Sequence, residues 1–154
     1  MDRDILTAIR TLLETERVLT AAVIVDGEPV AALLPYALSA DLTALYVQAS
    51  ALARHSRGLQ AGSTVSVLVH AAATPDRDPM QVPRLTVQAT VTLLDRESPG
   101  YAAAAERLTQ RFPVAATTLA LADFSVCALT LGRGRYVEGF ARAVTVGPAT
   151  FARA

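Results

Sequence analysis

Two spacings of apolar residues divide the chain. In residues 2–16 the apolar positions recur every three or four residues, so that Ile5, Ile9 and Leu12 would share one face of an amphipathic helix. In residues 84–94, RLTVQATVTLL, apolar and polar positions alternate, which predicts a half-buried strand. By these two criteria we expect helices at residues 2–16 and 99–112, and strands at residues 17–25, 29–38, 42–49, 64–70, 84–94, 124–131 and 136–146.

Glycine, proline and aspartate separate these segments. Asp26 and Gly27 predict a tight hairpin between the first two strands, and residues 132–134, Gly-Arg-Gly, predict a turn between the last two. Pro35 lies inside a predicted strand, where it indicates an edge, a bulge or a break because it cannot donate to a ladder. Residues 71–82 are expected to form a loop, and residues 114–122 fit either a short helix or an irregular segment.

Most predicted strands follow one another through short connections, which is typical of an antiparallel sheet. The helices are too few and too short to cover both faces of a parallel sheet. A sheet of this many strands usually closes to remove its edges. We therefore expect a mainly β fold with flanking helices, an antiparallel barrel that forms one domain over residues 1–154.

Composition narrows the functional classes. The 154 residues are 52% hydrophobic, which is enough for a compact core, and 14 acidic side chains balance 14 basic ones. Without a basic excess, a general nucleic-acid-binding role is not expected. Cys127 is the one cysteine, so no intramolecular disulfide can form. No leader-like segment or membrane-spanning apolar run is recognisable, and we expect a cytoplasmic protein.

Few residues suggest catalysis on their own. Neither a phosphate-binding glycine motif nor a nucleophile elbow is present. His55 and His70 form no metal-type pair with each other or with cysteine, so no metal site is expected. Cys127 lies within an apolar strand and is interpreted as a structural thiol. Asp76 and Asp78 in the long loop are interpreted as solvated turn residues. Catalytic residues therefore stay unassigned.

One basic stretch follows the third predicted strand. Ser50 stands where it could cap a helix over residues 51–61, and Arg54, His55 and Arg57 lie within that helix. Unpaired backbone N–H groups at a helix start, together with nearby cations, suit a bound anion. The alternative is a capped surface helix with solvated arginines. Spacing alone leaves both interpretations open.

Three segments in this order resemble a known family. They are PYALSADLTALYVQASALARHSRGL, PRLTVQATV and RYVEGFARAVTV, within residues 35–146. They are similar to the haem-utilisation (HugZ-like) branch of the pyridoxamine 5'-phosphate oxidase-like, FMN-binding split barrels. The resemblance implies an antiparallel split β-barrel that pairs into a homodimer, with FMN at the subunit interface.

The same resemblance assigns candidate site residues. Ser50, His55 and Arg57 would bind the FMN phosphate, with Arg54 in reserve. The ribityl chain and isoalloxazine ring would lie along Pro35, Tyr36 and Ala37, and Arg84 and Gln88 would start a strand that reaches toward the flavin. Arg142 would hold a substrate phosphate. The alternative for Tyr36 is a core aromatic residue, and for Arg142 a surface arginine.

The chain also departs from the family pattern. Gly58 replaces an asparagine, Ala89 and Ala141 replace glycines, and Val144 replaces the histidine of the vitamer oxidases. Oxidation of pyridoxamine phosphate is therefore not expected. Because the chain ends at Ala154, without the further domain of many haem-utilisation members, we expect FMN rather than haem. The expected function is an FMN-dependent oxidoreductase with an unknown small-molecule substrate. The alternatives are a haem-binding protein, with His55 or His70 as the ligand, and a cofactor-free dimer.

Overall fold

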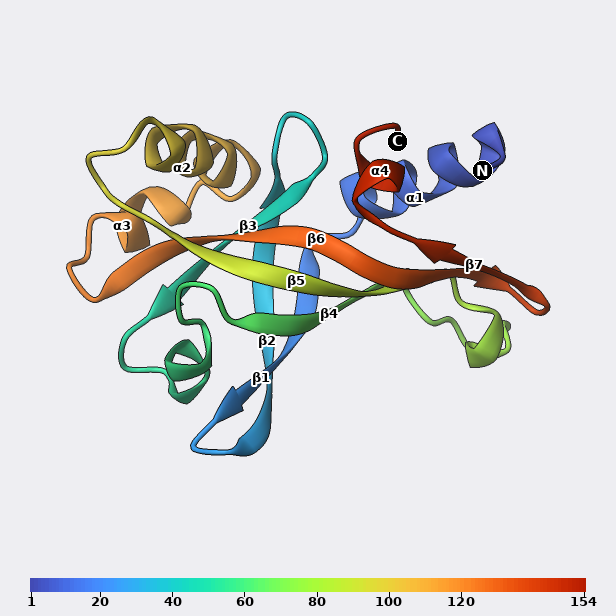
Figure 1. The fold of residues 1–154 in the computed structure, drawn as a ribbon, viewed down its shortest axis with the longest axis horizontal. Helices are drawn as coiled ribbons and strands as arrows, with labels where there is room; N and C mark the ends of the chain where they lie inside the picture. Colours follow the sequence, from blue (N-terminus) through green and yellow to red (C-terminus); the bar gives the residue numbers. More distant parts are fainter.

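The architecture is a closed antiparallel barrel, seen here in a computed structural model that describes residues 1–154 (Figure 1). Seven strands form one sheet in the order β3-β2-β1-β4-β5-β6-β7, and β3 also pairs with β6. That pairing closes six strands into a barrel and leaves β7 attached outside it. The strands are β1 (Val18–Val25), β2 (Glu28–Leu38), β3 (Ala44–Ser50), β4 (Thr64–His70), β5 (Arg84–Leu94), β6 (Phe124–Gly139) and β7 (Arg142–Val146). The predicted mainly β fold with an antiparallel barrel is confirmed.

Alternate side chains of each strand fill the barrel. In β5 every second residue from Leu85 to Val91 is buried, and the same alternation holds in β1 and β4. Leu34, Val67, Val87 and Leu129 are among the buried residues of a single 28-residue cluster. The period of two seen in the sequence therefore marks the inward-facing and outward-facing positions correctly.

Pro35 marks a change of partner within β2. Up to Val18↔Pro35 this strand pairs with β1, and from Tyr36↔Val47 onward it pairs with β3. Pro35 has no N–H to donate, so it fits at the point where one ladder ends and the next begins. The strand is therefore continuous, and the sheet turns a corner there.

The last predicted turn is wrong. β6 continues from Phe124 to Gly139 through residues 132–134, and the reversal falls between Gly139 and Arg142. A Cβ added to Gly134 would lie 2.3 Å from the carbonyl oxygen of Thr86, and one added to Gly132 would lie 3.0 Å from that of Gln88. These glycines allow β5 and β6 to approach closely beside a shift of register, so they are not turn residues.

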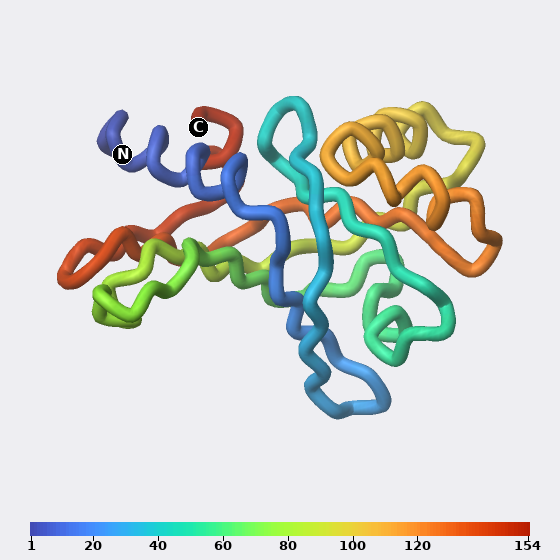
Figure 2. The backbone as a smooth tube through the Cα atoms, turned by 180° about the vertical axis from the view of Figure 1, so that it is seen from behind, coloured from blue at the N-terminus to red at the C-terminus, as the bar shows by residue number.

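The helices gather at one end of the barrel. They are α1 (Arg3–Thr15), α2 (Pro99–Arg111), α3 (Ala115–Leu119) and the short α4 (Pro148–Phe151). α1 adds Ile9, Leu12 and Leu13 to the main core, whereas α2 and α3 form a smaller cluster over Ala37 and Val126. Figures 1 and 2 show these helices at the end of the molecule opposite the β1–β2 hairpin. No helix is both long and apolar enough to cross a bilayer.

The basic stretch after β3 is a 3₁₀ helix rather than a capped α-helix. η1 (Arg54–Gly58) begins after Ala53, which makes no side-chain capping bond. Ser50 still belongs to β3, and its hydroxyl accepts from Leu52 N at 3.2 Å. η1 packs closely on β1, since a Cβ added to Gly58 would lie 2.6 Å from Val23 Cβ. A second 3₁₀ turn, η2 (Pro79–Gln81), lies in the predicted loop.

Candidate functional site

The outward side chains of three neighbouring strands form an exposed surface, which we call the outer face. Antiparallel pairing aligns Ala22 with Ser66 and Ser66 with Gln88, so alternate residues of β1, β4 and β5 point the same way. The outer face consists of Thr20, Ala22, Ile24, Thr64, Ser66, Leu68, His70, Arg84, Thr86 and Gln88, none of which is buried.

Two adjoining hollows lie on the outer face and share Ser66 and Gln88. One, of about 400 Å³, also contains Arg133 and Arg135 from β6. The other, of about 260 Å³, extends past Ile24 to the β1–β2 hairpin. The surface is thus polar and cationic toward β6 and apolar toward β1.

On the outer face, His70 is the side chain whose ring is oriented by a hydrogen bond to the backbone. Its Nδ1 lies 2.8 Å from the carbonyl oxygen of Ala71. Because a carbonyl oxygen can only accept, Nδ1 carries the proton, and in the neutral ring Nε2 carries the lone pair. The residue is exposed and lies directly opposite Arg84 in the β4–β5 ladder. The imidazole is therefore oriented by the backbone and has a free nitrogen to offer a ligand.

Arg84 and Gln88, both predicted site residues, lie on the outer face. Arg84 donates through Nη1 to the carbonyl oxygens of Met80 at 3.0 Å and Val82 at 3.2 Å, which ties the β4–β5 connection to the barrel. Gln88 borders both hollows. These two predicted residues are brought together with His70 and Ser66, which sequence reasoning did not assign to this site as a group.

The predicted phosphate residues lie at another end of the barrel and already have acidic partners. Arg57 Nη2 contacts both carboxylate oxygens of Asp26, at 2.7 and 2.8 Å. The hydroxyl of Ser50 donates to Asp123 Oδ2 at 2.7 Å. His55, on η1, is half-buried and makes no side-chain hydrogen bond. A phosphate at this place would lie close to two carboxylates, which opposes its binding.

Arg54 repeats this arrangement, because its Nη2 lies 2.9 Å from Glu28 Oε2. Together with the Arg57–Asp26 pair, it joins η1 to the β1–β2 hairpin. Both arginines are more than half exposed, so each pair contributes little to stability. These ion pairs neutralise the two arginines that the sequence suggested as ligands of an anion.

The remaining predicted residues are dispersed. Pro35 is exposed, but the ring of Tyr36 and the methyl group of Ala37 are buried, at 0% and 2% exposure. The Tyr36 hydroxyl donates to the carbonyl oxygen of Leu13 at 2.7 Å, so this ring belongs to the core. Arg142 lies in the β6–β7 hairpin, where Nη1 is 2.9 Å from Glu138 Oε2.

Two of the departures from the family pattern have structural consequences of different kinds. Ala89 is buried with its methyl group inside the barrel, away from the outer face. Ala141 has φ +63°, a left-handed conformation that glycine adopts at lower cost. The first substitution therefore does not narrow a surface site, whereas the second strains the β6–β7 turn.

No protein-family model matches the sequence, and no curated protein matches it. Solved structures do match. A haem-binding protein from Mycobacterium smegmatis is 24% identical with a TM-score of 0.86, and the match covers 99% of this chain and 62% of that one. HutZ, the haem storage protein of Vibrio cholerae, is 22% identical with a TM-score of 0.73, covering 81% and 88%. A Clostridium acetobutylicum protein related to general stress protein 26, of the pyridoxinephosphate oxidase family, is 15% identical with a TM-score of 0.71, covering 98% and 99%.

These likenesses establish the fold. The barrel with its flanking helices is shared with haem-binding proteins and with the pyridoxinephosphate oxidase family, as the resemblance of the motifs implied. This chain spans about 62% of the length of the Mycobacterium smegmatis protein. At these identities the shared fold does not transfer any ligand.

Sequence reasoning missed Ser66, Arg133 and Arg135, and assigned His70 only as an alternative. Alternation in β4 does put Ser66 and His70 on one face, so that part of the signal was available. The link to β5 and β6 depends on the register of strands that are distant in sequence. The bond from His70 to Ala71 has no sequence signature.

Proposed function

We propose that this protein binds haem on the outer face, with His70 Nε2 as the axial ligand. The observation that carries the proposal is the contact of 2.8 Å between His70 Nδ1 and the Ala71 carbonyl oxygen. Histidines that bind metals commonly donate their other ring N–H to a backbone carbonyl, which fixes the tautomer and the ring orientation. His70 has this support before any ligand binds.

The side chains around His70 match the chemical groups of a haem. A haem iron is held by its porphyrin and needs as little as one protein ligand, so the lack of any group of three His, Cys, Asp or Glu side chains is no obstacle. Leu68, two residues before His70 on the same face of β4, offers apolar surface to a macrocycle. Arg84 and Arg135 offer guanidinium groups to the propionates. When bound, haem would supply the iron and redox chemistry, and the protein would hold and orient it.

The neighbours support the same proposal. Two of the proteins that share this fold are described as a haem-binding protein and a haem storage protein. In the predicted phosphate site, in contrast, Arg54 pairs with Glu28 and Arg57 with Asp26. The Ser50 hydroxyl there donates to Asp123. These observations reverse the preference for FMN that the sequence suggested.

The proposal includes a homodimer in which a second copy covers the outer face. Three large apolar side chains are exposed on β1 and β2, with exposed fractions of 41% for Val18, 60% for Ile24 and 68% for Leu33. Leu33 pairs with Thr20 of the outer face, so apolar side chains lie on and beside this face, where a second copy would remove them from water. A cofactor on the outer face would then lie between two subunits.

FMN is the second candidate, and oxidoreductase activity depends on it. It is favoured by the Clostridium acetobutylicum neighbour of the pyridoxinephosphate oxidase family and by the cations next to Ser50. For FMN to bind there, Arg57 would have to exchange Asp26 for the phosphate. Oxidation of pyridoxamine phosphate is not proposed, because Val144 stands at the histidine position.

An absorbance titration separates the candidates. Haemin and, separately, FMN are added to the wild-type protein and to the variants His70→Ala and His55→Ala. We expect a shifted Soret band in the wild type and in His55→Ala, and its loss or a return toward the spectrum of free haemin in His70→Ala. A Soret band that depends on His55 would overturn the ligand assignment. A spectrum that responds only to FMN, and weakens with Arg57→Ala, would establish the second candidate.

The dimer is tested separately by light scattering after gel filtration. We expect the wild type to have the mass of two chains, and Leu33→Lys to have the mass of one, because a lysine would be desolvated in the interface. A wild-type protein that stays monomeric at all concentrations would overturn the dimer without affecting the His70 assignment.

A further inference from the structure

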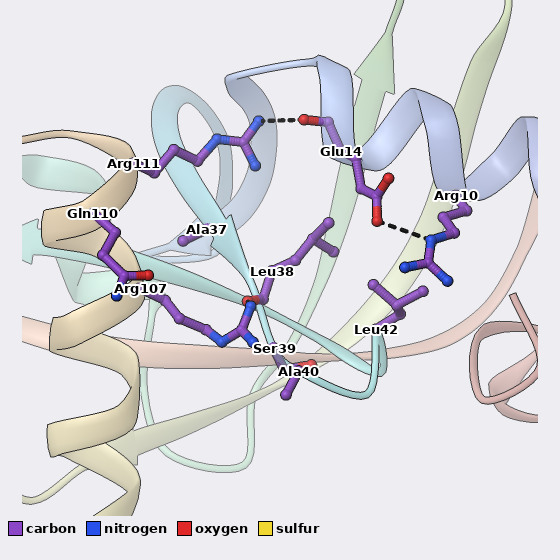
Figure 3. A pocket seen from close by; sticks show the side chains of 10 residues that line it. All are labelled: Arg10, Glu14, Ala37, Leu38, Ser39, Ala40, Leu42, Arg107, Gln110 and Arg111. Atoms are coloured by element: carbon purple, nitrogen blue, oxygen red, sulfur yellow. Dashed lines mark hydrogen bonds and ion pairs between the residues drawn. The ribbon is translucent and has the colours of Figure 1, made fainter.

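A cavity of about 410 Å³ lies between α1, α2 and the hairpin that joins β2 to β3 (Figure 3). It is at the helical end of the molecule, away from the β1–β2 hairpin and η1 (Figure 2). Arg10 and Glu14 of α1 and Arg107 and Arg111 of α2 line it. Its volume falls within the range of small-molecule sites, about 300–1,000 Å³.

The charges in this cavity are unbalanced. Three arginines face it and one glutamate, so the local net charge is +2. Arg10 pairs with Glu14 through Nε at 2.8 Å, and neither Arg107 nor Arg111 has a carboxylate partner. Elsewhere in this electroneutral chain the arginines of η1 do have carboxylate partners. Bringing uncompensated cations together costs free energy, which a bound anion would recover.

Two of the arginines are fixed by backbone carbonyls. Arg111 Nη2 donates to the carbonyl oxygens of Glu14, at 3.2 Å, and Glu16, and its guanidinium lies 4.9 Å from the centroid of the Tyr36 ring. Arg107 Nη1 donates to Leu38 O at 3.1 Å, which leaves Nε and Nη2 of Arg107 without a partner. Arg107 is thus held beside the cavity with donors to spare.

We propose that this cavity binds a small dianion whose charge lies on phosphate or carboxylate oxygens. The guanidinium groups of Arg10 and Arg107 would contact the anion, since each has two free donor nitrogens in a fork that matches such oxygens. Arg111, whose Nη2 donates to carbonyl oxygens at the end of α1, contributes charge and joins the two helices. Figure 3 shows the three guanidinium groups around the space above Leu38 and Ser39.

The remaining walls mix polar and apolar side chains. Ala37, Leu38, Ala40 and Leu42 are apolar, whereas Ser39 and Gln110 offer hydrogen-bonding groups to the rest of the ligand. This site is independent of the haem proposal, because none of its residues belongs to the outer face.

Calorimetric titration with inorganic phosphate and with succinate tests the proposal. We expect one or both to bind the wild type, and Arg107→Gln to weaken binding roughly tenfold or more, as for the loss of charge-assisted hydrogen bonds. Arg3→Gln, an exposed arginine on α1 outside the cavity, is the control and should bind like the wild type. Binding of phosphate alone or succinate alone identifies which oxygens are recognised.

A second variant is expected to bind the anion more tightly than the wild type, a result that misfolding of the variant could not produce. Glu14→Gln removes the one negative charge of the cavity and retains the backbone carbonyl that Arg111 contacts. We expect it to bind the same anion several-fold more tightly at low salt. The proposal is overturned if neither anion binds the wild type, if Arg3→Gln weakens binding as much as Arg107→Gln, or if Glu14→Gln leaves the affinity unchanged.

Discussion

The hydroxyl of Tyr36 makes one hydrogen bond inside the core, so removing it tests how much that bond contributes to stability. The ring is fully buried, and the hydroxyl donates to the carbonyl oxygen of Leu13 at 2.7 Å. Leu13 lies in the last turn of α1, where carbonyls have no partner within the helix. Tyr36→Phe leaves this carbonyl buried and unsatisfied. We expect the free energy of unfolding to fall by about 1–3 kcal/mol at neutral pH.

The pH dependence of the free energy of unfolding provides a second test of the same prediction. Burial raises the pKa of Tyr36 above its ordinary range, and the nearby Arg111 opposes this only in part. Above its ordinary pKa of about 10 the phenol ionises in the unfolded chain but stays protonated in the folded one. The stabilisation is therefore complete below that pH and is lost above it, by about 1.4 kcal/mol per pH unit. Phenylalanine cannot ionise, so the difference between the two proteins should narrow as the pH rises.

Urea denaturation followed by circular dichroism at neutral pH and between about pH 10 and 11 measures both effects. The control is Tyr101→Phe on α2, a partly exposed tyrosine without a hydrogen bond from its hydroxyl, which we expect to change stability by less than about 0.5 kcal/mol. Equal stability of Tyr36→Phe and the wild type, or a difference that stays constant above pH 10, would contradict the reasoning. Because the ring is in the core, haemin and FMN titrations of Tyr36→Phe should match those of the wild type.

Three further predictions concern glycine, alanine and cysteine positions. Gly134→Ala places a Cβ 2.3 Å from Thr86 O, so we expect a loss of stability of roughly 1–3 kcal/mol or more in urea denaturation, whereas Gly100→Ala, whose nearest contact is 3.6 Å, should cause no loss. Ala141→Gly removes left-handed strain of about 1–2 kcal/mol but adds chain entropy to the unfolded state, so thermal unfolding should shift up slightly or stay unchanged; a clear downward shift would contradict the strain. Burial raises the pKa of Cys127 to about 11, so a thiol reagent at neutral pH should label it only after denaturant is added.

The barrel could be read from the sequence because its strands alternate and its early connections are short. The β1–β2 hairpin follows from Asp26 and Gly27, whose φ angles of +54° and +79° suit the tight turn that links two strands. The error in β6 has a different origin. Glycine in a strand and glycine in a turn look alike in sequence, and only the close approach of β5 distinguishes them.

The helix predicted at Ser50 failed for a related reason. Serine followed by a basic segment favours a cap, but the same hydroxyl can bond a distant side chain. Here Asp123, 73 positions along the chain, accepts from Ser50, and Ser56 donates to the Ser50 carbonyl oxygen at 2.5 Å. The local pattern and the tertiary contacts compete, and the contacts keep Ser50 in the strand.

The proposed position of anion binding depends on which arginines have carboxylate partners, and the sequence alone does not show this. Residues 54–57 look cationic because their neighbours in sequence are apolar or neutral, yet the fold brings Asp26 and Glu28 against them. Arg107 and Arg111 look like ordinary helix arginines beside Glu106, yet the fold gives them carbonyl partners and no carboxylate. Charge compensation is decided by pairings across tens of residues. Arg107 and Arg111 in the cavity between α1 and α2 therefore have no carboxylate partner, whereas the two arginines in the segment that resembles a phosphate site each have one. We expect phosphate or succinate to bind through Arg107, and Arg57→Ala to leave that affinity unchanged. This result would show that the absence of carboxylate partners, and not a local sequence motif, determines where the protein binds an anion.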